Sequence, residues 1–408
     1  MKKVLLLLCL VFQIVSVKLY AQTGVFVPEL SVVDAQVNEF MQKWNLPGGS
    51  IAVVKDGKLI YARAFGEADK DTPVTPQHLF RIASLSKPVT AMAIMKLIQD
   101  GMLQADAQVF GEKGILNNPE YQNIKDERIK RITVRHLLEH TAGWDREINP
   151  IGDPMFNSIK IAEEMHAPAD QQTIIQYILS KPLDFEPGTR FSYSNIGYCI
   201  IGRVIEKVTG LPYGEYVYQQ LLQPLGISDM HLAKNLYEAK HENEVRYYDI
   251  PSRGLMPSVY EPGTKVSYPY GGFNLEAMDA HGGWLASATD IAKLIVAADG
   301  FSTKPDFLQA RTIDMMTTPC KQYPGYAMGW FVNNSGNWWH TGSLAGSSAL
   351  MARIQEGYSW VVLFNGNPQT HAYFSGLDQL MATALRKVHM WPVHDLFHPS
   401  TSTQRDTQ

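Results

Sequence analysis

Residues 49–66 read Gly49-Ser-Ile-Ala-Val-Val-Lys55-Asp56-Gly57-Lys58-Leu-Ile-Tyr-Ala-Arg-Ala-Phe-Gly66. The Asp56-Gly57 pair separates two runs rich in β-forming residues, which is the strongest short-range signal of a β-hairpin. Further strand candidates, with Asn- and Gly-containing turns between them, lie near the other end of the chain at 326–332, 337–340, 347–354 and 359–365. Because antiparallel strands occur at both ends, we expect one sheet built from both termini, with helices near 33–44 and 373–388.

The middle of the chain has a different pattern. Helical periodicity dominates from about residue 104 to 275, with expected helices at 133–140, 172–179, 196–209 and 213–222. We therefore predict an α/β (α+β) fold in which residues 25–103 and 276–392 form the sheet domain and residues 104–275 form an inserted, mostly helical subdomain. A disordered tail is expected over 393–408.

Residues 247–281 form a long irregular stretch that contains five tyrosines. Loops of this length in compact proteins are usually binding or lid elements. Its aromatic content argues against simple disorder. We expect this stretch to line the substrate pocket.

The first 21 residues have the layout of a signal peptide. Lys2 and Lys3 precede an apolar run at 4–17, and Ala21 is followed by a suitable cleavage point. The run is short for a membrane span, and no later segment is long and apolar enough for one. We expect an exported protein, periplasmic or secreted, with no stable membrane span after cleavage.

The composition excludes some partners and leaves other features open. The chain has 408 residues, 45% hydrophobic, and a net charge of −4, so no general attraction to nucleic acid is implied. Cys199 and Cys320 remain after signal removal, and they could be either paired or free. We expect a small-molecule or peptide substrate; the sequence carries no signal for oligomeric state.

Ser84-Leu-Ser-Lys87 opens an apolar run, 88–101, that reads as a buried helix. A cation in the first turn of a helix is disfavoured by roughly 0.3–1 kcal/mol. Burial of such a lysine lowers its pKa further. A serine one turn before such a lysine is a nucleophile beside a base. The alternative is that Ser84 or Ser86 caps the helix and Lys87 is solvated.

Two later motifs could complete a site. Tyr193-Ser-Asn195 precedes a helix; a tyrosine beside a lysine could act as a phenolate that moves protons. His340-Thr341-Gly342-Ser343 lies on an expected strand, where Gly342 would allow close approach of a substrate backbone. The amides of Ser343 and Ser84 could then form an oxyanion hole. Taken singly, each motif could also be an ordinary turn.

In this order the motifs resemble the penicillin-recognising serine hydrolases: class C β-lactamases, DD-peptidases and their esterase relatives. Three further stretches are similar to that family, namely 135–143, 186–195 and 282–292. The resemblance implies Ser84 as nucleophile, Lys87 and Tyr193 as proton-transfer groups, and Asn195, His340, Thr341, Gly342 and Ser343 as substrate-binding residues. It implies no cofactor and no metal.

His340-Thr341-Gly342 resembles the third motif of the family, which reads Lys-Thr-Gly in the lactamases. His340 therefore stands where the lactamases have a lysine. A fixed cation is thereby replaced by a residue whose charge depends on pH, which puts efficient β-lactam turnover in doubt. We therefore expect a serine hydrolase that forms an acyl-Ser84 intermediate on esters or amides. The alternatives are an acyltransferase that uses an alcohol such as a lipid or sterol hydroxyl, a β-lactamase, and a non-catalytic binding protein.

A competing motif is His136-Leu-Leu-Glu139-His140, which matches an inverted zinc-peptidase signature. On a continuous helix, both histidines would share a face. A metal site would need a further ligand, and no residue nearby is an obvious candidate. We keep the zinc peptidase as the least favoured alternative.

Overall fold

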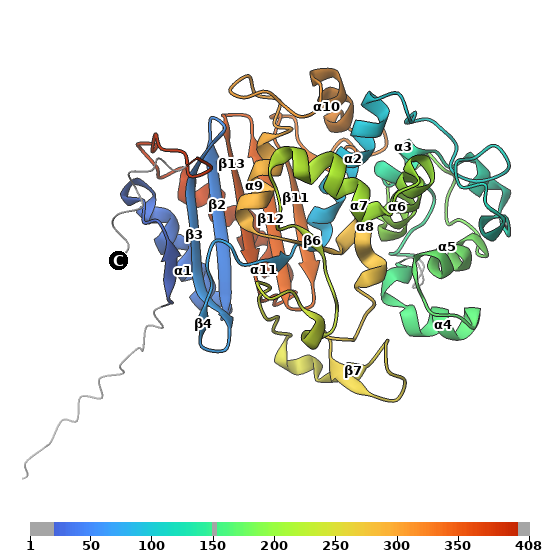
Figure 1. Ribbon diagram of the computed structural model, residues 1–408, viewed down its shortest axis with the longest axis horizontal. Helices are drawn as coiled ribbons and strands as arrows, with labels where there is room; N and C mark the ends of the chain where they lie inside the picture. The colour runs from blue at the N-terminus through green and yellow to red at the C-terminus, as the bar shows by residue number, and fades with distance from the viewer. Residues whose placement is uncertain (1–19, 149–152, 399–408) are drawn as a thin grey trace, which may run out of the picture.

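The computed structural model describes residues 20–148 and 153–398, so most of the predicted signal peptide, 1–19, lies outside the described residues. Among the described residues, eight strands form an antiparallel sheet in the order β1-β3-β2-β13-β12-β11-β10, with β4 paired to β3 (Figure 1). A mostly helical region lies beside one end of this sheet. The predicted mixed α/β fold with an antiparallel sheet is confirmed.

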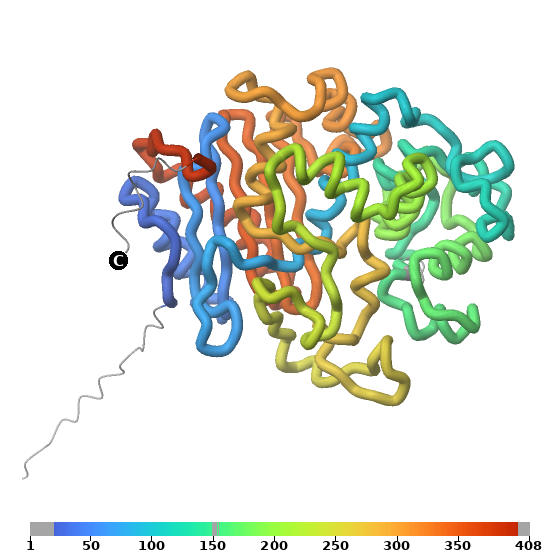
Figure 2. Tube along the Cα trace, in the orientation of Figure 1, coloured from blue at the N-terminus to red at the C-terminus, as the bar shows by residue number. Residues whose placement is uncertain are grey.

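The predicted hairpin joins β2 (Gly48–Lys55) to β3 (Lys58–Asp69), with Lys55 paired to Lys58. Asp56 and Gly57 both have positive φ, as the tight hairpin turn requires. β13 (Tyr358–Phe364) pairs along the other edge of β2, so the two chain ends meet in the middle of the sheet. Figure 2 shows the blue hairpin beside the orange-red C-terminal strands.

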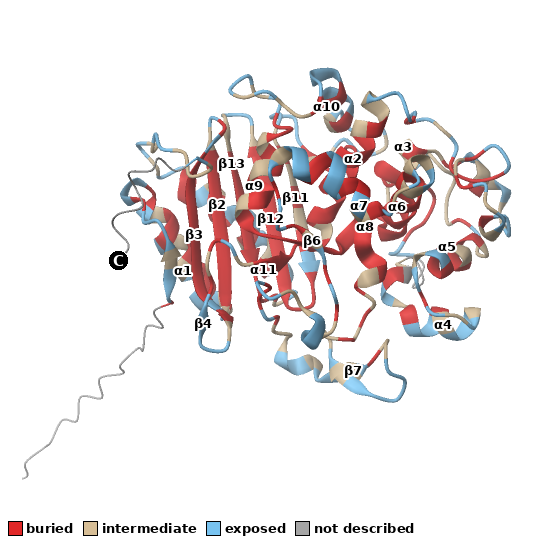
Figure 3. Cartoon of the chain, viewed as in Figure 1, coloured by how far each residue is buried: buried red, intermediate tan, exposed pale blue. Residues whose placement is uncertain are grey.

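Both faces of the sheet are covered. Ile51 and Val53 of β2 pack in a cluster with α1 (Ser31–Trp44) and α11 (His371–Leu385). The alternate residues Ala52 and Val54 belong to the larger core on the other face. Each fully buried Val or Ile stabilises the fold by roughly 1.5–3 kcal/mol. Figure 3 shows that the central strands are buried on both sides.

The helix α2 (Ser86–Gln99) is the element that carries the Ser-Lys pair into the interior. It contacts α6 and α8 of the helical region, and its residues are almost all buried. The strands β11 and β12 contact the 3-10 helix η2 (Ala83–Leu85) directly before it. The site therefore forms where the sheet edge meets the helical region.

The remaining strands of the structure are short, apart from β11 and β12. They are β1 (Gln22–Gly24), β4 (Thr72–Pro73), β5 (Phe80–Arg81), β6 (His231–Leu232), β7 (Leu255–Pro257), β8 (Lys265–Ser267), β9 (Trp284–Ala286), β10 (Phe331–Val332), β11 (Trp338–Leu344) and β12 (Ser347–Ile354). The remaining helices are α3 (Val134–Leu138), α4 (Ser158–Met165), α5 (Gln171–Leu179), α6 (Asn195–Thr209), α7 (Tyr213–Val217), α8 (Asp279–Gly282), α9 (Ala288–Val296) and α10 (Ala310–Thr317).

The predicted disordered tail is wrong for residues 393–398. The amide of Leu396 donates to the Leu59 carbonyl, and Asp395 accepts from the Leu59 amide, so the segment is held against the start of β3. Residues 399–408 lie outside the described residues. Cys199 and Cys320 are both buried and free. Within residues 20–148 and 153–398, no helix has the length and apolar character to cross a membrane.

The tyrosine-rich stretch 247–281 packs around Arg81, which lies three residues before Ser84. The Arg81 guanidinium is fully buried, 3.2 Å from Glu244 and 4.4 Å from the ring centre of Tyr247. It also donates to the carbonyls of Lys234, Asn235 and Pro269. A buried charge needs such partners. Tyr247 and Tyr270 of this stretch therefore support the strand that leads to Ser84.

Candidate active site

Ser84 and Lys87 meet at the start of α2. Ala83 holds a left-handed backbone (φ +50°), and Ser84 follows in η2, before α2 begins at Ser86. The Lys87 Nζ lies 3.1 Å from Ser84 Oγ, and Lys87 is fully buried. A non-glycine residue in the left-handed region costs of order 1–3 kcal/mol and such residues cluster at functional sites. The local chain is thus strained where the serine is presented.

The surroundings of Lys87 favour a neutral amine. Burial lowers the pKa of Lys87 well below its ordinary value; Asp153 opposes this shift and Arg146 adds to it. Nζ lies 2.7 Å from Asn195 Oδ1 and 2.9 Å from the His281 carbonyl, both of which only accept hydrogen bonds. A neutral amine has two N–H donors and one lone pair. The two donors face these acceptors, which leaves the lone pair for the Ser84 hydroxyl.

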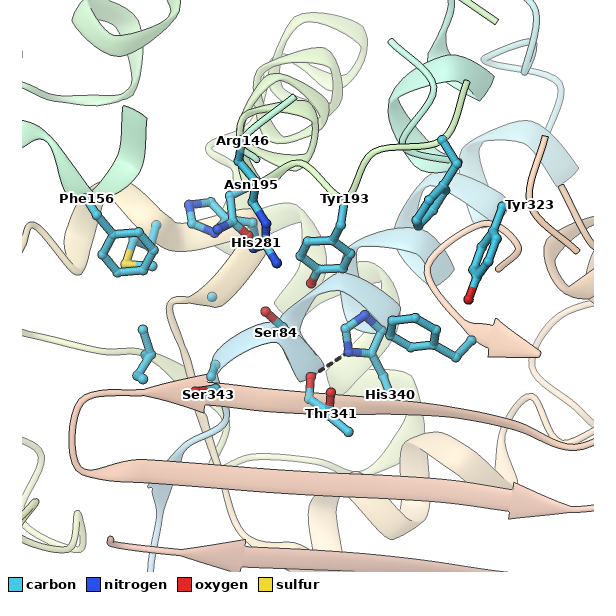
Figure 4. A pocket seen from close by; sticks show the side chains of 16 residues that line it. Ser84, Arg146, Phe156, Tyr193, Asn195, His281, Tyr323, His340, Thr341 and Ser343 are labelled. Atoms are coloured by element: carbon cyan, nitrogen blue, oxygen red, sulfur yellow. Dashed lines mark hydrogen bonds between the residues drawn. The ribbon is translucent and has the colours of Figure 1, made fainter. Parts of the chain in front are cut away.

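Tyr193 lies on the other side of the serine. Lys87 Nζ is 4.8 Å from its ring centre, and its hydroxyl points towards Ser84 (Figure 4). Burial raises the pKa of Tyr193 above its ordinary value, more than the proximity of Ser84 and of Arg146 lowers it. Burial therefore disfavours the phenolate form that the sequence analysis considered for Tyr193. Tyr193 is a phenol that can donate a proton.

His340 is part of a buried hydrogen-bond chain. Its Nδ1 lies 2.7 Å from the Thr341 carbonyl, so Nδ1 carries the hydrogen and Nε2 accepts. The Ser194 amide donates to His140 Nδ1, so His140 Nε2–H donates to the Tyr326 hydroxyl at 3.1 Å. Tyr326 in turn faces His340 Nε2 at 3.5 Å. The chain thus runs from His140 through Tyr326 to His340.

This environment keeps His340 uncharged. Burial and the proximity of Lys87 lower the pKa of His340 to about 3. The expected pH-dependent charge at this position is therefore absent at physiological pH. His340 is therefore a neutral hydrogen-bond acceptor at the position where the lactamases have a lysine.

Gly342 lies directly against the segment that precedes Ser84. A Cβ at this position would lie 2.4 Å from the Ile82 carbonyl and 3.2 Å from Ala83 Cβ. The glycine therefore makes room for the segment that precedes Ser84. This close approach brings Ser343, which lines the cleft, beside Ser84.

The cleft has a volume of about 420 Å³ and contains every predicted site residue except Lys87, which lies buried behind Ser84, and Gly342. Figure 4 shows Phe156 on one side of Ser84, and Tyr193, His340 and Tyr323 on the other. The lining residues are Ala83, Ser84, Arg146, Phe156, Phe191, Tyr193, Asn195, Met278, His281, Gly282, Tyr323, Phe331, His340, Thr341, Ser343 and Leu344. Of the stretch 247–281 that was predicted to line the pocket, Met278 and His281 do so, whereas no residue of 247–275 is among the lining residues.

Three polar groups of the site were not predicted from the sequence. Arg146 lines the cleft, Asp153 accepts from Asn195 Nδ2, and the His281 carbonyl accepts from Lys87. Burial raises the pKa of Asp153. His281 directly precedes the Gly282-Gly283 motif, which could have drawn attention to it. Nothing in the local pattern distinguishes Arg146 or Asp153 from surface charges.

The zinc alternative fails on backbone geometry. α3 ends at Leu138, and His140 has a left-handed backbone (φ +57°), so His136, Glu139 and His140 do not share one helix face. His140 is committed to the chain with Tyr326. In the described part of the protein, no group of three or more His, Cys, Asp or Glu side chains is arranged to hold a metal ion.

The antiparallel sheet with its helical region, and the serine-lysine pair at the start of α2, define a protein of the β-lactamase-like fold. The Beta-lactamase family model matches residues 33–384, and the chain belongs to this family. Protein flp of Staphylococcus aureus (strain NCTC 8325 / PS 47) is 26% identical over 347 residues, which cover 83% of this chain but 63% of flp. The chain therefore spans less than two thirds of the length of that relative.

Two further proteins are similar over most of the chain. A putative D-alanyl-D-alanine carboxypeptidase of Escherichia coli O157:H7 is 25% identical over 335 residues, which cover 77% of this chain and 74% of that protein. The solved structure of EstCE1, described as a hydrolase with promiscuous acyltransferase activity, has a TM-score of 0.66 at 22% identity. That match covers 86% of this chain and 98% of EstCE1, and it concerns the fold alone.

Proposed function

We propose that this protein is an acyl-transfer enzyme that forms a covalent ester on Ser84, using ester or amide substrates. The observation that carries the proposal is the contact between Lys87 Nζ and Ser84 Oγ, 3.1 Å, in a lysine whose pKa is lowered and whose other partners are acceptors. A neutral amine in this position can take the serine proton as Oγ attacks. All other steps follow from the groups around this pair.

In the acylation step, Ser84 Oγ forms a bond to the substrate carbonyl carbon while its proton passes to Lys87. The amides of Ser84 and Ser343 stabilise the charge that develops on the carbonyl oxygen; loss of one such donor typically slows reactions about 100- to 1000-fold. The Tyr193 phenol donates a proton to the leaving group as the bond between the carbonyl carbon and the leaving group breaks. Lys87 then returns its proton to Tyr193, directly or through water.

In the second step, an acceptor attacks the acyl-Ser84 ester, its proton is taken up by the same pair, and Oγ leaves as the hydroxyl. Water as acceptor gives hydrolysis; an alcohol gives transfer. The cleft wall beside Tyr193 is aromatic, with Phe191 stacked on Tyr323 at 4.6 Å between ring centres. This wall suits an apolar alcohol as the acceptor, which makes transfer a possible second activity.

Without a cation at position 340, substrates that carry no carboxylate beside the scissile bond fit this site better than β-lactams do. His340 is neutral because its pKa is about 3, so it offers no charge to a β-lactam carboxylate. We therefore propose esterase or D-peptidase-like activity first, with transfer to an alcohol as the alternative.

The proposal is tested by a fluorophosphonate probe and intact-mass measurement. The expected result is one probe on wild-type protein and none on Ser84→Ala. Ser86→Ala is the matched control: it lies in the same tetrapeptide with its hydroxyl near the Trp284 amide, and it should still be labelled. Equal labelling of wild type and Ser84→Ala, or no labelling of wild type, would contradict the proposal.

A further inference from the structure

His281 carries a buried ring nitrogen that has no partner in the protein. The residue is 1% exposed and lies in α8, where its backbone carbonyl accepts from the Lys87 amine. Its side-chain Nε2 is enclosed, and none of the described residues hydrogen-bonds it. A buried polar group that stays unpaired destabilises the protein, so such groups usually have a partner. An imidazole nitrogen that the protein itself leaves unpaired is a candidate for contact with a ligand.

The position of the imidazole connects it to the acyl side of the cleft. His281 is a lining residue of the cleft that contains Ser84. Figure 4 shows His281 beside Asn195, on the side of the cleft towards Phe156. Tyr193, which protonates the leaving group in the proposed mechanism, lies on the other side of Ser84 from Phe156 (Figure 4). His281 is thereby placed on the side of the acyl group and away from the leaving group.

Gly282 keeps space open next to His281. It also lines the cleft, its φ is not positive, and a Cβ built there would meet only ordinary contacts, 3.4 Å or more from the Met278 side chain. Neither the backbone conformation nor a close approach therefore requires a glycine at this position, in contrast to Gly342. The missing side chain leaves room for a substrate group against His281.

The imidazole is neutral, and its free nitrogen is a hydrogen-bond acceptor. Burial and the proximity of Lys87 lower the pKa of His281 well below its ordinary value, and its own backbone opposes this shift. A neutral imidazole has one N–H donor and one lone pair. A backbone group that raises a histidine pKa is one that accepts from a ring N–H, and Nδ1 is the ring nitrogen nearer to the backbone. We therefore assign the hydrogen to Nδ1, which leaves the lone pair on Nε2.

We infer that His281 Nε2 accepts a hydrogen bond from a hydroxyl or N–H group on the acyl part of the substrate. The apolar lining residues Phe156 and Met278 hold the carbon chain around this one polar contact. The inference rests on the proposed function and adds a substrate class to it. The substrates are esters or amides whose acyl group is mainly apolar and carries a hydrogen-bond donor, because a plain alkanoyl group leaves Nε2 unpaired.

The test compares aryl esters that share one leaving group. The reference is meta-carbamoylphenyl hexanoate, and the test compounds are its 2-hydroxy, 3-hydroxy and 6-hydroxy derivatives, each with a methoxy partner that keeps the oxygen but has no donor. Wild type should cleave at least one hydroxy ester with a kcat/KM about three- to tenfold above that of its methoxy partner, the usual effect of one neutral hydrogen bond.

Variants of His281 assign the preference to Nε2. His281→Phe keeps a ring and the backbone carbonyl that Lys87 needs, and it should bring each hydroxy and methoxy pair to similar values. His281→Gln retains an acceptor and should keep part of the preference. His241→Phe is the matched control: His241 stacks on His231 at 4.7 Å between ring centres and does not line the cleft, so the preference should persist.

The inference is overturned if no hydroxy ester is preferred over its methoxy partner, or if the preference survives in His281→Phe. The first of these results is also expected if Nε2 only holds an ordered water molecule that the substrate never displaces.

A binding measurement separates this inference from the proposed chemistry. Calorimetry on Ser84→Ala protein uses the same three hydroxy and methoxy pairs as meta-carbamoyl anilides. At least one hydroxy anilide should have a Kd about three- to tenfold lower than its partner, and the double variant with His281→Phe should lose the difference. This result is expected even if no ester is turned over, in which case only the proposed function fails. Equal Kd values in all three pairs would overturn the His281 assignment.

Discussion

Asn195 Oδ1 fixes the direction in which the Lys87 amine points, at 2.7 Å, and with the His281 carbonyl it uses both N–H donors of a neutral amine. The lone pair is thereby directed to Ser84. This arrangement makes Lys87 the general base of the proposed mechanism, and each of the following predictions depends on it or on the groups around it.

Replacement of Lys87 by Met should reduce kcat/KM about 100- to 10,000-fold, the usual contribution of a general base. Met fills a similar apolar volume but has no lone pair to receive the serine proton. The measurement is steady-state hydrolysis of meta-carbamoylphenyl hexanoate, with circular dichroism and thermal unfolding to confirm the fold. A folded variant with the wild-type rate would remove Lys87 from the mechanism.

The acid limb of the kcat/KM profile should report the proton on Lys87, because only the unprotonated amine accepts from Ser84. Asp153 raises the pKa of Lys87 and Arg146 lowers it. Asp153→Asn should therefore move the acid limb to lower pH, and Arg146→Gln should move it to higher pH. Shifts in the same direction, or no shift in either variant, would show that another group controls this limb.

His340 should make the protein sensitive to acid. Its folded-state pKa is about 3, so between pH 3 and the unfolded value of about 6.5 the unfolded state binds a proton that the folded state does not. The contribution of this group to stability therefore falls as pH decreases below about 6.5, by about 2 kcal/mol at pH 5.

The check is the free energy of unfolding in urea at pH 7.5 and at pH 5, for wild type and His340→Gln. The variant should lose about 2 kcal/mol less than wild type between these two pH values. An identical loss in both proteins would mean that His340 is protonated in the folded state or is not buried.

Gly342→Ala should damage the site through the backbone. Its Cβ would lie 2.4 Å from the Ile82 carbonyl, so the segment that carries Ser84 must move. We expect a loss of 1–3 kcal/mol in stability, roughly, and a fall in kcat of about 100-fold or more if an oxyanion donor is displaced. Gly376→Ala in α11 is the control: its nearest neighbour is the Phe40 side chain at 3.2 Å, and activity should be unchanged. Normal activity of Gly342→Ala would contradict the close contact.

The sheet was predictable because its signals are local. Asp56-Gly57 specifies its own turn, and the apolar runs of β2 and β13 indicate strands whichever neighbours they meet. The site was predictable only where residues lie close together in a motif, as Ser84 and Lys87 do. The sequence did not identify Arg146 and Asp153 as site residues, because no local pattern encodes the path of the chain that brings them to the cleft.

Burial accounts for the remaining differences between expectation and structure. The charge states of Tyr193 and His340 are set by desolvation, which depends on the whole packed core and not on their neighbours in sequence. Tyr247 and Tyr270 pack against the buried Arg81 guanidinium. The burial of Arg81 could not be predicted from its position in the sequence. Gly342 leaves room for the Ile82 carbonyl, and this contact joins segments that are far apart in sequence.

The most direct test of the account is to trap the acyl-enzyme. Wild-type protein is quenched in acid during turnover of meta-carbamoylphenyl hexanoate, digested, and mapped by mass spectrometry. The account predicts a hexanoyl group on the peptide that contains Ser84, located to that residue by fragmentation and absent from Ser84→Ala. Turnover with no acylated peptide, or with the hexanoyl group on another residue, would contradict it.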